Sequence, residues 1–537
     1  MKKKFLRLAA LSVLSLAGWN KAAAQGAGTL SGDLMMNGNF FQRDSAIGAW
    51  NNALYDKVLS GGEGWLSLRY SNFGFTGFLR LDVFNNSNLQ KPAEAMTGFG
   101  IGAWSISKEI KGLTITGGYI YDQIGSGIIF RAYEDRGLLI DNALAGLHLK
   151  YKLDDHITLK AFTGQQKNVF ERYRPVIKGF NAEADYDLGK GVHITPGAGV
   201  VNRTLDEESY NTVRTNIEAF PVEDRFTPKF NTYAFTAYNT LTAGDFTWYV
   251  EGAYKTHEAI YNLGGRKLID KPGNIIFSTL GYARKGIAVN LTGKRTENFV
   301  MRTSPLESAL PNSGMVNWQP IVAQIRPQRL IARYMPASQD LSEQAFNANV
   351  LLSPTDDYDF NLSYTHINTL DNIKLYREAY FEANIRSVRN FLIDVGVHYM
   401  HYNKNYYQKS VEDEYIVKAL TPFTEITYLI NNKSSLKMQA QYMHTREDDG
   451  SWAFLSLEYA IAPKWSFALS DMYNVKPEGF KTYEGQHFYN IFIARTQGAH
   501  RISLAYVKQV EGINCTGGVC RYEPGFSGLK LMITSSF

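Results

Sequence analysis

The sequence predicts an all-β protein: a transmembrane antiparallel β-barrel of about 24 strands (22–26), with long extracellular loops that partly fill the lumen. Three observations predict this class. Segments of about ten residues with alternating polarity recur along the chain. Short and long connections alternate between them, and the last of these segments ends on an aromatic residue.

The alternating segments have the length and pattern of membrane-crossing strands. Leu79, Leu81 and Val83 alternate with Arg80 and Asp82, so one face of the strand is apolar and the other is charged. Comparable segments cover 180–186, 246–255 and 436–442. In hydrocarbon every backbone N–H and C=O must pair within the protein, and strands achieve this only in a closed sheet.

The connections between these segments differ in length in a regular way. Tight turns are expected at 71–72, 110–112, 154–155, 189–191, 243–245, 284–286, 431–433, 462–464 and 497–499. Longer polar connections lie near 41–61, 124–142, 202–231, 258–273, 299–343, 404–414, 475–486 and 511–526. Short periplasmic turns with long outer loops are typical of outer-membrane barrels.

The first residues have the features of a secretory signal. Basic residues precede an apolar run over 8–19, which is too short to cross a bilayer as a helix, and Ala22, Ala23 and Ala24 supply small residues for cleavage. We therefore expect residues 1–24 to be a cleaved signal peptide and residues 25–537 to form a single barrel domain, since no linker interrupts them.

The net charge of +5 comes from this signal segment. Five basic residues and no acidic ones lie there (Lys2, Lys3, Lys4, Arg7 and Lys21), so the remainder is 5 − 5 = 0. A neutral mature chain gives no support to nucleic-acid binding.

The last ten residues form an alternating segment that ends at Phe537. Leu529, Leu531, Ile533 and Phe537 share one face of it. A final aromatic residue on the apolar face resembles the C-terminal assembly signal of bacterial outer-membrane barrels. It implies recognition by the barrel-assembly machinery and a place in the outer membrane of a Gram-negative bacterium, among its lipid and lipopolysaccharide.

The densest polar constellation lies within 125–142 and contains Arg131, Glu134, Asp135, Arg136 and Asp141. These residues are candidates for a constriction inside the lumen, like the charged groups that set selectivity in pores. The alternative is a solvated extracellular loop held by its own ion pairs. The apolar residues within the same stretch favour the inward position.

The longest connection, 299–343, contains four arginines, Arg302, Arg326, Arg329 and Arg333. Long loops without clear structure are usually functional or mobile. Two interpretations stand: a second segment folded into the lumen, or a basic surface loop that faces lipopolysaccharide. A barrel near 24 strands has a wide interior, so something is expected to fill it.

Cys515 and Cys520 can form a disulfide at the tip of the last outer loop, because two glycines between them allow a tight turn. His398 and His401 fall on opposite faces of a strand and cannot chelate a metal together. Tyr402, Tyr406 and Tyr407 are expected in an interfacial aromatic girdle. Catalytic triads, phosphate-binding loops and zinc-binding spacings are missing, so we expect no enzyme, metal or cofactor.

Two stretches resemble a known family: 130–136 with Asp141 and Asn142, and the tail from Cys515 to Pro524 with 534–537. Both are similar to a family of uncharacterised outer-membrane barrels from Bacteroidetes, defined as a domain of unknown function. The resemblance covers most of the mature chain. It implies an outer-membrane barrel and no particular substrate.

Together these patterns favour a porin-like channel for passive or gated solute passage. The alternative is a closed barrel that serves as a structural subunit of an outer-membrane assembly or secretion machine, with envelope protein partners.

Overall fold

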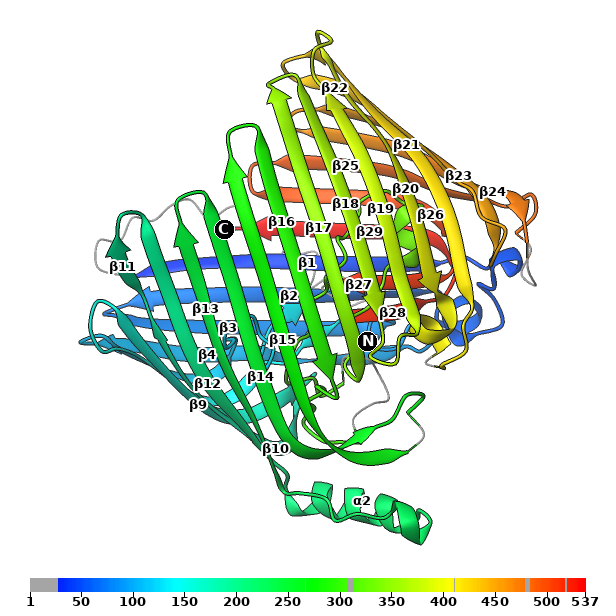
Figure 1. The fold of residues 1–537 in the computed structure, drawn as a ribbon. Helices are drawn as coiled ribbons and strands as arrows, with labels where there is room; N and C mark the ends of the chain where they lie inside the picture. The colour runs from blue at the N-terminus through cyan, green and yellow to red at the C-terminus, as the bar shows by residue number, and fades with distance from the viewer. Residues whose placement is uncertain (1–27, 266, 307–312, 410, 479–482, 517–518) are drawn as a thin grey trace.

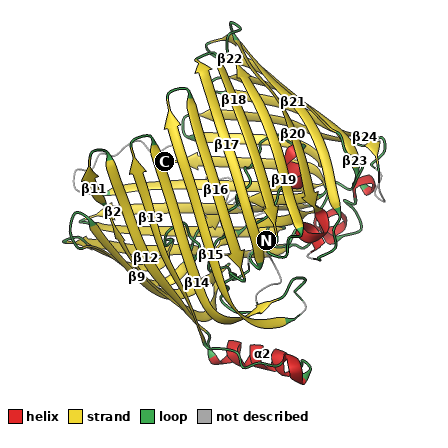
Figure 2. Cartoon of the chain, viewed as in Figure 1, coloured by secondary structure: helices red, strands yellow, loops and turns green. Residues whose placement is uncertain are grey.

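The computed structural model describes residues 28–265, 267–306, 313–409, 411–478, 483–516 and 519–537, and the side chains of 514–520 are not among those described. The chain forms a closed antiparallel barrel with few helices (Figures 1 and 2). Its sheet has 25 strand pieces, of which β10 and β11 are two parts of one crossing because both pair with β12, so the barrel has 24 strands.

The strand bounds of the barrel follow the chain order. They are β1 Thr29–Phe41, β2 Ser60–Asn72, β3 Phe75–Ser87, β4 Met96–Ile110, β5 Leu113–Ile120, β8 Leu144–Lys152, β9 Ile157–Asn168, β10 Glu171–Ala184, β11 Tyr186–Gly189, β12 Val192–Thr204, β13 Asn231–Ala243, β14 Phe246–Tyr261, β15 Leu268–Arg284, β16 Ile287–Glu297, β17 Ser342–Thr355, β18 Tyr358–Asn368, β19 Lys374–Ile385, β20 Phe391–Asn403, β21 Ile416–Asn431, β22 Ser434–Met443, β23 Gly450–Ile461, β24 Trp465–Pro477, β25 His487–Gln497, β26 His500–Gln509 and β29 Phe526–Ser536.

In the described part of the chain, two small hairpins and six helical segments lie in the connections. The hairpins are β6 Glu134–Asp135 with β7 Ile140–Asp141, and β27 Gly512–Thr516 with β28 Val519–Glu523. The helical segments are η1 Ser45–Ile47, η2 Leu54–Val58, α2 Glu207–Glu218, η3 Val222–Asp224, η4 Ile331–Tyr334 and η5 Asn405–Lys409. Among the described residues no helix is long and apolar enough to cross a bilayer.

The barrel closes where the first and last strands pair. β1 pairs with β29 from Asp33 opposite Ser536 to Phe41 opposite Gly528. The backbone of Phe537 exchanges two hydrogen bonds with Gly32, at 2.9 and 3.0 Å. A Cβ at Gly32 would lie 2.5 Å from the Phe537 ring, so glycine lets the terminal aromatic ring cover the seam. Because β1 pairs with both β2 and β29, neither the first nor the last strand is left as a free edge of the sheet.

The two faces of the wall reverse the polarity of a soluble protein. Large apolar side chains point outward and are exposed, as at Phe99 (77 %) and Leu469 (54 %). Charged side chains point inward and are almost fully covered, as at Arg80, Glu251 and Lys255. The predicted alternation is confirmed, since Leu81 and Val83 are exposed while Arg80 and Asp82 are buried. An apolar outer belt around a polar interior is the arrangement that a bilayer requires.

Short turns join the strands at one end of the barrel and long connections at the other. Tight turns such as 73–74, 244–245 and 285–286 alternate with connections such as 121–143, 205–230 and 298–341. The helix α2 lies in the second of these, beyond the barrel end in Figure 1. The sequence predicted only a long polar connection there. The helix begins after Asp206, whose side chain accepts from Ser209 N at 3.2 Å, and acidic residues occupy its first turn.

Candidate functional site

The connection 121–143, between β5 and β8, folds into the lumen. Its apolar residues Ile128, Ile129 and Phe130 are buried against inward-facing wall side chains, and the Phe130 and Phe162 rings lie 4.4 Å apart. Gly125 has φ +55°, and a Cβ there would lie 2.7 Å from the Glu251 carboxylate. The first turn of the connection can therefore approach the wall closely only with glycine. We call this segment the first lumen loop.

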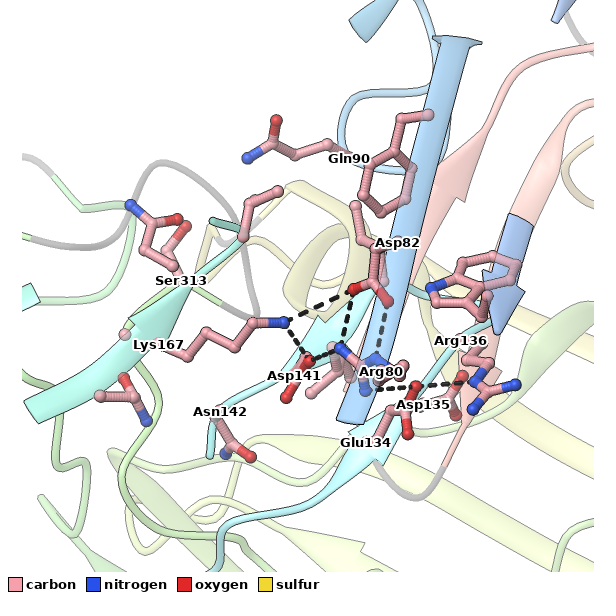
Figure 3. A pocket seen from close by; sticks show the side chains of 18 of the residues that line it. Arg80, Asp82, Gln90, Glu134, Asp135, Arg136, Asp141, Asn142, Lys167 and Ser313 are labelled. Carbon is pink, nitrogen blue, oxygen red and sulfur yellow. Dashed lines mark hydrogen bonds and ion pairs between the residues drawn. The ribbon is translucent and has the colours of Figure 1, made fainter. Parts of the chain in front are cut away.

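A buried ion cluster ties the first lumen loop to the wall (Figure 3). Arg80 on β3 contacts Asp82 at 2.7 Å, Glu134 at 2.9 Å and Asp141 at 2.5 Å. Lys167 at the end of β9 also binds Asp141. Arg80 and Lys167 are each only 2 % exposed at the side chain. Each buried charge thus has an opposite charge beside it, which is the condition under which burial of charge is tolerated.

Arg136 extends this cluster toward the closing seam of the barrel. It contacts Glu134 at 2.7 Å and Asp33 of β1 at 3.6 Å, and its guanidinium lies 5.6 Å from the centre of the Trp65 ring. The first lumen loop therefore spans the interior from β9 to β1.

The structure places the five predicted constriction residues in three different settings. Glu134, Arg136 and Asp141 meet in the ion cluster. Asp135 instead accepts from Leu138 N at 3.1 Å and stabilises the tip of the loop. Arg131 lies between two aromatic rings, those of Tyr133 and Trp318, with centroids at 4.5 and 4.6 Å.

The electrostatics of the cluster favour its ionised form. Burial opposes ionisation of Asp141, but Lys167 and Arg80 outweigh burial and hold the pKa of this carboxyl below its usual range. The cavity beside the cluster measures about 70 Å³, which leaves room for a few waters and not for a solute. The ion cluster can hold a loop in place, and the cavity beside it is too small for a ligand.

The connection 298–341 also folds inward, so the structure supports the first of the two interpretations of this arginine-rich segment. Lys255 donates to Val300 O at 2.6 Å, and Lys294 donates to Pro320 O at 2.8 Å. Across the lumen, Arg326 contacts Glu378 of β19 at 3.1 Å. We call this segment the second lumen loop.

The second lumen loop continues to the opposite wall and the outer connections. Leu330 N donates to Gln441 of β22 at 2.8 Å, and Arg333 contacts Asp449 at 2.9 Å. The two lumen loops also bind each other. Arg131 N donates to Val316 O at 2.9 Å, and Trp318 N donates to Gly127 O at 3.0 Å. Together they form one connected filling that extends from β1, β3 and β9 to β19 and β22.

Two adjoining cavities remain beside this filling. The larger, of about 960 Å³, lies between the second lumen loop and the connections after β20, β22 and β26. The smaller, of about 450 Å³, continues along β26, β29 and β1. Gln509 and Glu523 line both cavities, so the two spaces meet there.

Sequence reasoning missed the wall partners of the first lumen loop, Arg80 and Lys167. The signal for Arg80 was present, because a charged residue on the inward face of an alternating strand implies a partner inside the lumen. The segment that supplies this partner lies 61 residues away from Arg80, at Asp141.

The predicted aromatic girdle around Tyr402, Tyr406 and Tyr407 is wrong. Tyr402 and Tyr406 are buried, at 1 % and 5 % exposure, and Tyr407 packs against their cluster. They cover the second lumen loop near Tyr334, whose ring lies 5.5 Å from that of Tyr402. Alternation alone did not distinguish an aromatic residue that meets lipid from one that meets an inward loop.

In the part of the chain that the structure describes, no three His, Cys, Asp or Glu side chains are grouped as metal ligands. The backbone pairs Cys515 with Cys520 across the β27–β28 hairpin, and their side chains lie outside the described ones. The predicted signal segment 1–24 likewise lies outside the described residues.

The closed wall, its apolar outer belt and its loop-filled interior define a large membrane β-barrel. The whole chain, residues 1–537, matches the model of DUF6029, a family of unknown function, and belongs to that family. No curated protein matches it.

Solved structures similar in fold include the translocation pore of the P pilus usher PapC. That likeness has TM-score 0.44 and 11 % identity, over 94 % of this chain and 99 % of the usher chain. The ferric-catecholate import receptor Fiu of E. coli K12 gives TM-score 0.40 and 10 % identity, over 96 % of this chain and 82 % of the receptor. The siderophore receptor PirA of Pseudomonas aeruginosa gives 0.41 and 8 %, over 96 % and 81 %.

Proposed function

We propose that the protein is a porin-like channel of the outer membrane, whose lumen is occupied on one side by the two lumen loops and open on the other. The observation that carries this proposal is the pair of adjoining cavities along β26, β29 and β1. A barrel that served only as a closed structural part would have no need of an open space along its wall.

The smaller cavity follows the inner wall over much of its height. On β26 it is lined from Gln509 near the outer end to Ser503 near the short turn. Six residues of a strand cover about 20 Å. Met532 on the adjacent strand β29 lies opposite Asn37 of β1, and both residues line the cavity. The Met532 side chain is 40 % exposed. An exposed methionine on the inner wall indicates space beside it.

In this proposal the ion cluster of the first lumen loop sets the width of the passage. Glu134, Arg136 and Asp141 hold the loop against β1, β3 and β9 through ion pairs. Asp135 stabilises the tip of the loop, and Arg131 packs against Trp318 of the second lumen loop. In this proposal the five residues Arg131, Glu134, Asp135, Arg136 and Asp141 act as a fixed constriction element through the position that they give the loop.

Single-channel recording of the folded, purified protein in a planar bilayer tests the proposal. Stepwise openings that persist at steady voltage are expected, with a conductance below that of an unobstructed barrel of this size. Silence from protein shown to be folded by heat-modifiable mobility on a gel would overturn it.

One observation favours the second candidate, a closed structural subunit. The two lumen loops reach the wall through several buried ion pairs, which would suit a filling that never moves. In that case the protein would be silent in a bilayer and would co-purify with envelope proteins in mild detergent.

The remaining expectations belong to the same proposal. They are export by the cleaved segment 1–24, an origin in Bacteroidetes, recognition of the last strand and Phe537 by the barrel-assembly machinery, and contact with outer-membrane lipid and lipopolysaccharide. A disulfide between Cys515 and Cys520 would hold the outer β27–β28 hairpin, where their backbones are paired.

A further inference from the structure

The larger cavity is lined by charged residues whose pairing is uneven. Among its carboxylates, Asp449 is paired with Arg333 and Asp448 with Lys404. Tyr334 also donates to Asp448, at 2.7 Å. The carboxylates in this part of the wall are therefore already engaged by neighbouring groups.

The other two carboxylates of the larger cavity are also occupied. Glu523 is paired with Arg521. Glu511 accepts hydrogen bonds from the hydroxyls of Tyr483 and Tyr522. The printed contacts of these four carboxylates do not include one further cation of the cavity wall.

Arg329 is that further cation. It lines the larger cavity and is half-buried, and no carboxylate oxygen of the described residues lies within 4.0 Å of it. Burial first, and then repulsion from Arg333, lower the pKa of its guanidinium to about 10. Lys530 of β29, which lines the smaller cavity, is close enough to interact electrostatically with Glu523 and, more weakly, with Arg329.

We propose that Arg329 anchors a binding site for the anionic group of a small solute, a carboxylate or a phosphate, where the two cavities meet. A half-buried guanidinium without an acidic partner gains a charge-assisted bidentate contact when such a group enters. Lys530 adds a second cation on the path inward. It also has no carboxylate within 4.0 Å among the described residues, and its ammonium lies 4.4 Å from the Phe526 ring centre.

The size of the site sets the class of solute. A cavity of about 960 Å³ is at the upper end of the range for small-molecule sites, so it accommodates an acidic sugar or a comparable anion and excludes a folded protein. Tyr415 and Tyr522 line the same space and are exposed, which provides apolar surface beside the cations. The inference deepens the proposed channel function and rests on it, because the site would select what enters the passage.

Calorimetric titration of the detergent-folded full chain tests the site, with inorganic phosphate, glucuronate and glucose as three separate probes. Saturable binding of at least one of the two anions, and none of glucose, is expected. Preference between phosphate and glucuronate then identifies which anionic group the site takes.

Three variants make the test specific. Arg329→Gln is expected to weaken anion binding at least tenfold. Arg329→Lys keeps the charge and loses the bidentate contact, so it is expected to weaken binding less than Arg329→Gln. Arg295→Gln, which removes an exposed arginine paired with Glu297 on β16, is expected to leave binding unchanged. Equal anion binding by wild type and Arg329→Gln, binding of glucose as strong as that of the anions, or no anion binding at all would overturn the inference.

The titration uses no bilayer, so its result is separate from the channel assay. If the protein binds anions and is silent in the bilayer, the proposed channel function is contradicted and the proposed anion site stands. If the protein conducts and binds no anion, the proposed anion site is contradicted and the channel function stands.

Discussion

The two sides of the lumen differ in what covers the inner wall. On the side of β3, β9 and β14, inward charges such as Arg80, Lys167 and Glu251 are almost fully buried beneath the first lumen loop. On the side of β26, β29 and β1, inward residues such as Ser503 and Met532 line open space. The same alternating strand pattern thus supports a filled half and an open half. The difference lies in whether a loop reaches the wall.

The comparison shows what charge does inside a wide barrel. Where a loop covers the wall, each charge needs a partner at short range, and the chain supplies it from the loop. Where no loop covers it, a cation such as Lys530 has no carboxylate within 4.0 Å among the described residues, and Glu523 acts on it only from a greater distance. In the filled half the ion pairs hold the first lumen loop in position, and in the open half the wall borders space that a solute can enter.

Removal of the filling should have the largest effect. Replacement of 125–139 by a short Gly-Ser linker deletes the part of the first lumen loop that crosses the interior, so single-channel conductance is expected to rise severalfold. The matched control replaces 207–218, the helix that lies beyond the barrel end, and should leave conductance unchanged. An unaltered conductance in the first variant would show that the filled half does not limit passage.

Narrowing of the open half should give the next largest effect. Ser503→Trp places a large ring in the smaller cavity and is expected to reduce conductance to less than half. Leu504→Trp on the adjacent position faces outward, where leucine is 42 % exposed, and should conduct like wild type. If both variants conduct alike, the passage does not follow β26.

Loss of one tether should weaken the filling without removing it. Asp141→Asn leaves Arg80 and Lys167 without one of their carboxylates, and breaking such a buried pair costs about 3 kcal/mol. Protease cleavage within 121–143 is therefore expected to accelerate by about a hundredfold. Asp155→Asn, in an exposed turn, serves as the control. Equal cleavage rates in both variants would contradict the tether role of Asp141.

The pH dependence should be the smallest effect near neutrality. The folded pKa of Asp141 lies below its usual 3.8, because Lys167 and Arg80 outweigh burial. A lowered pKa contributes stability that is complete above the unfolded value and is lost as the pH falls through the folded one. Conductance is thus expected to stay constant from about pH 7 to about pH 5 and to rise only below about pH 4. A rise in conductance between pH 7 and pH 5 would show that a titratable group other than Asp141 controls the position of the loop.

The wall could be predicted from the sequence, and the contents of the lumen only in part. A period of two places Leu81 and Val83 outward and Arg80 inward regardless of the rest of the chain, because neighbouring residues of a strand face opposite sides. The position of the loop at 121–143 inside the lumen also followed from its apolar residues. The role of Asp135 as a turn-stabilising residue, rather than a member of the ion cluster, did not.

What the sequence by itself determined is the class: a closed membrane barrel with short turns at one end, long connections at the other, and an aromatic residue at its last position. Only the tertiary structure decided which groups meet inside the lumen. Arg80 and Asp141 are 61 residues apart, and Leu330 and Gln441 are 111 apart. Strand polarity is a local property, because it depends on the alternation of adjacent side chains. Pairing across a lumen depends on barrel closure and on how two loops fit together, which no local pattern encodes.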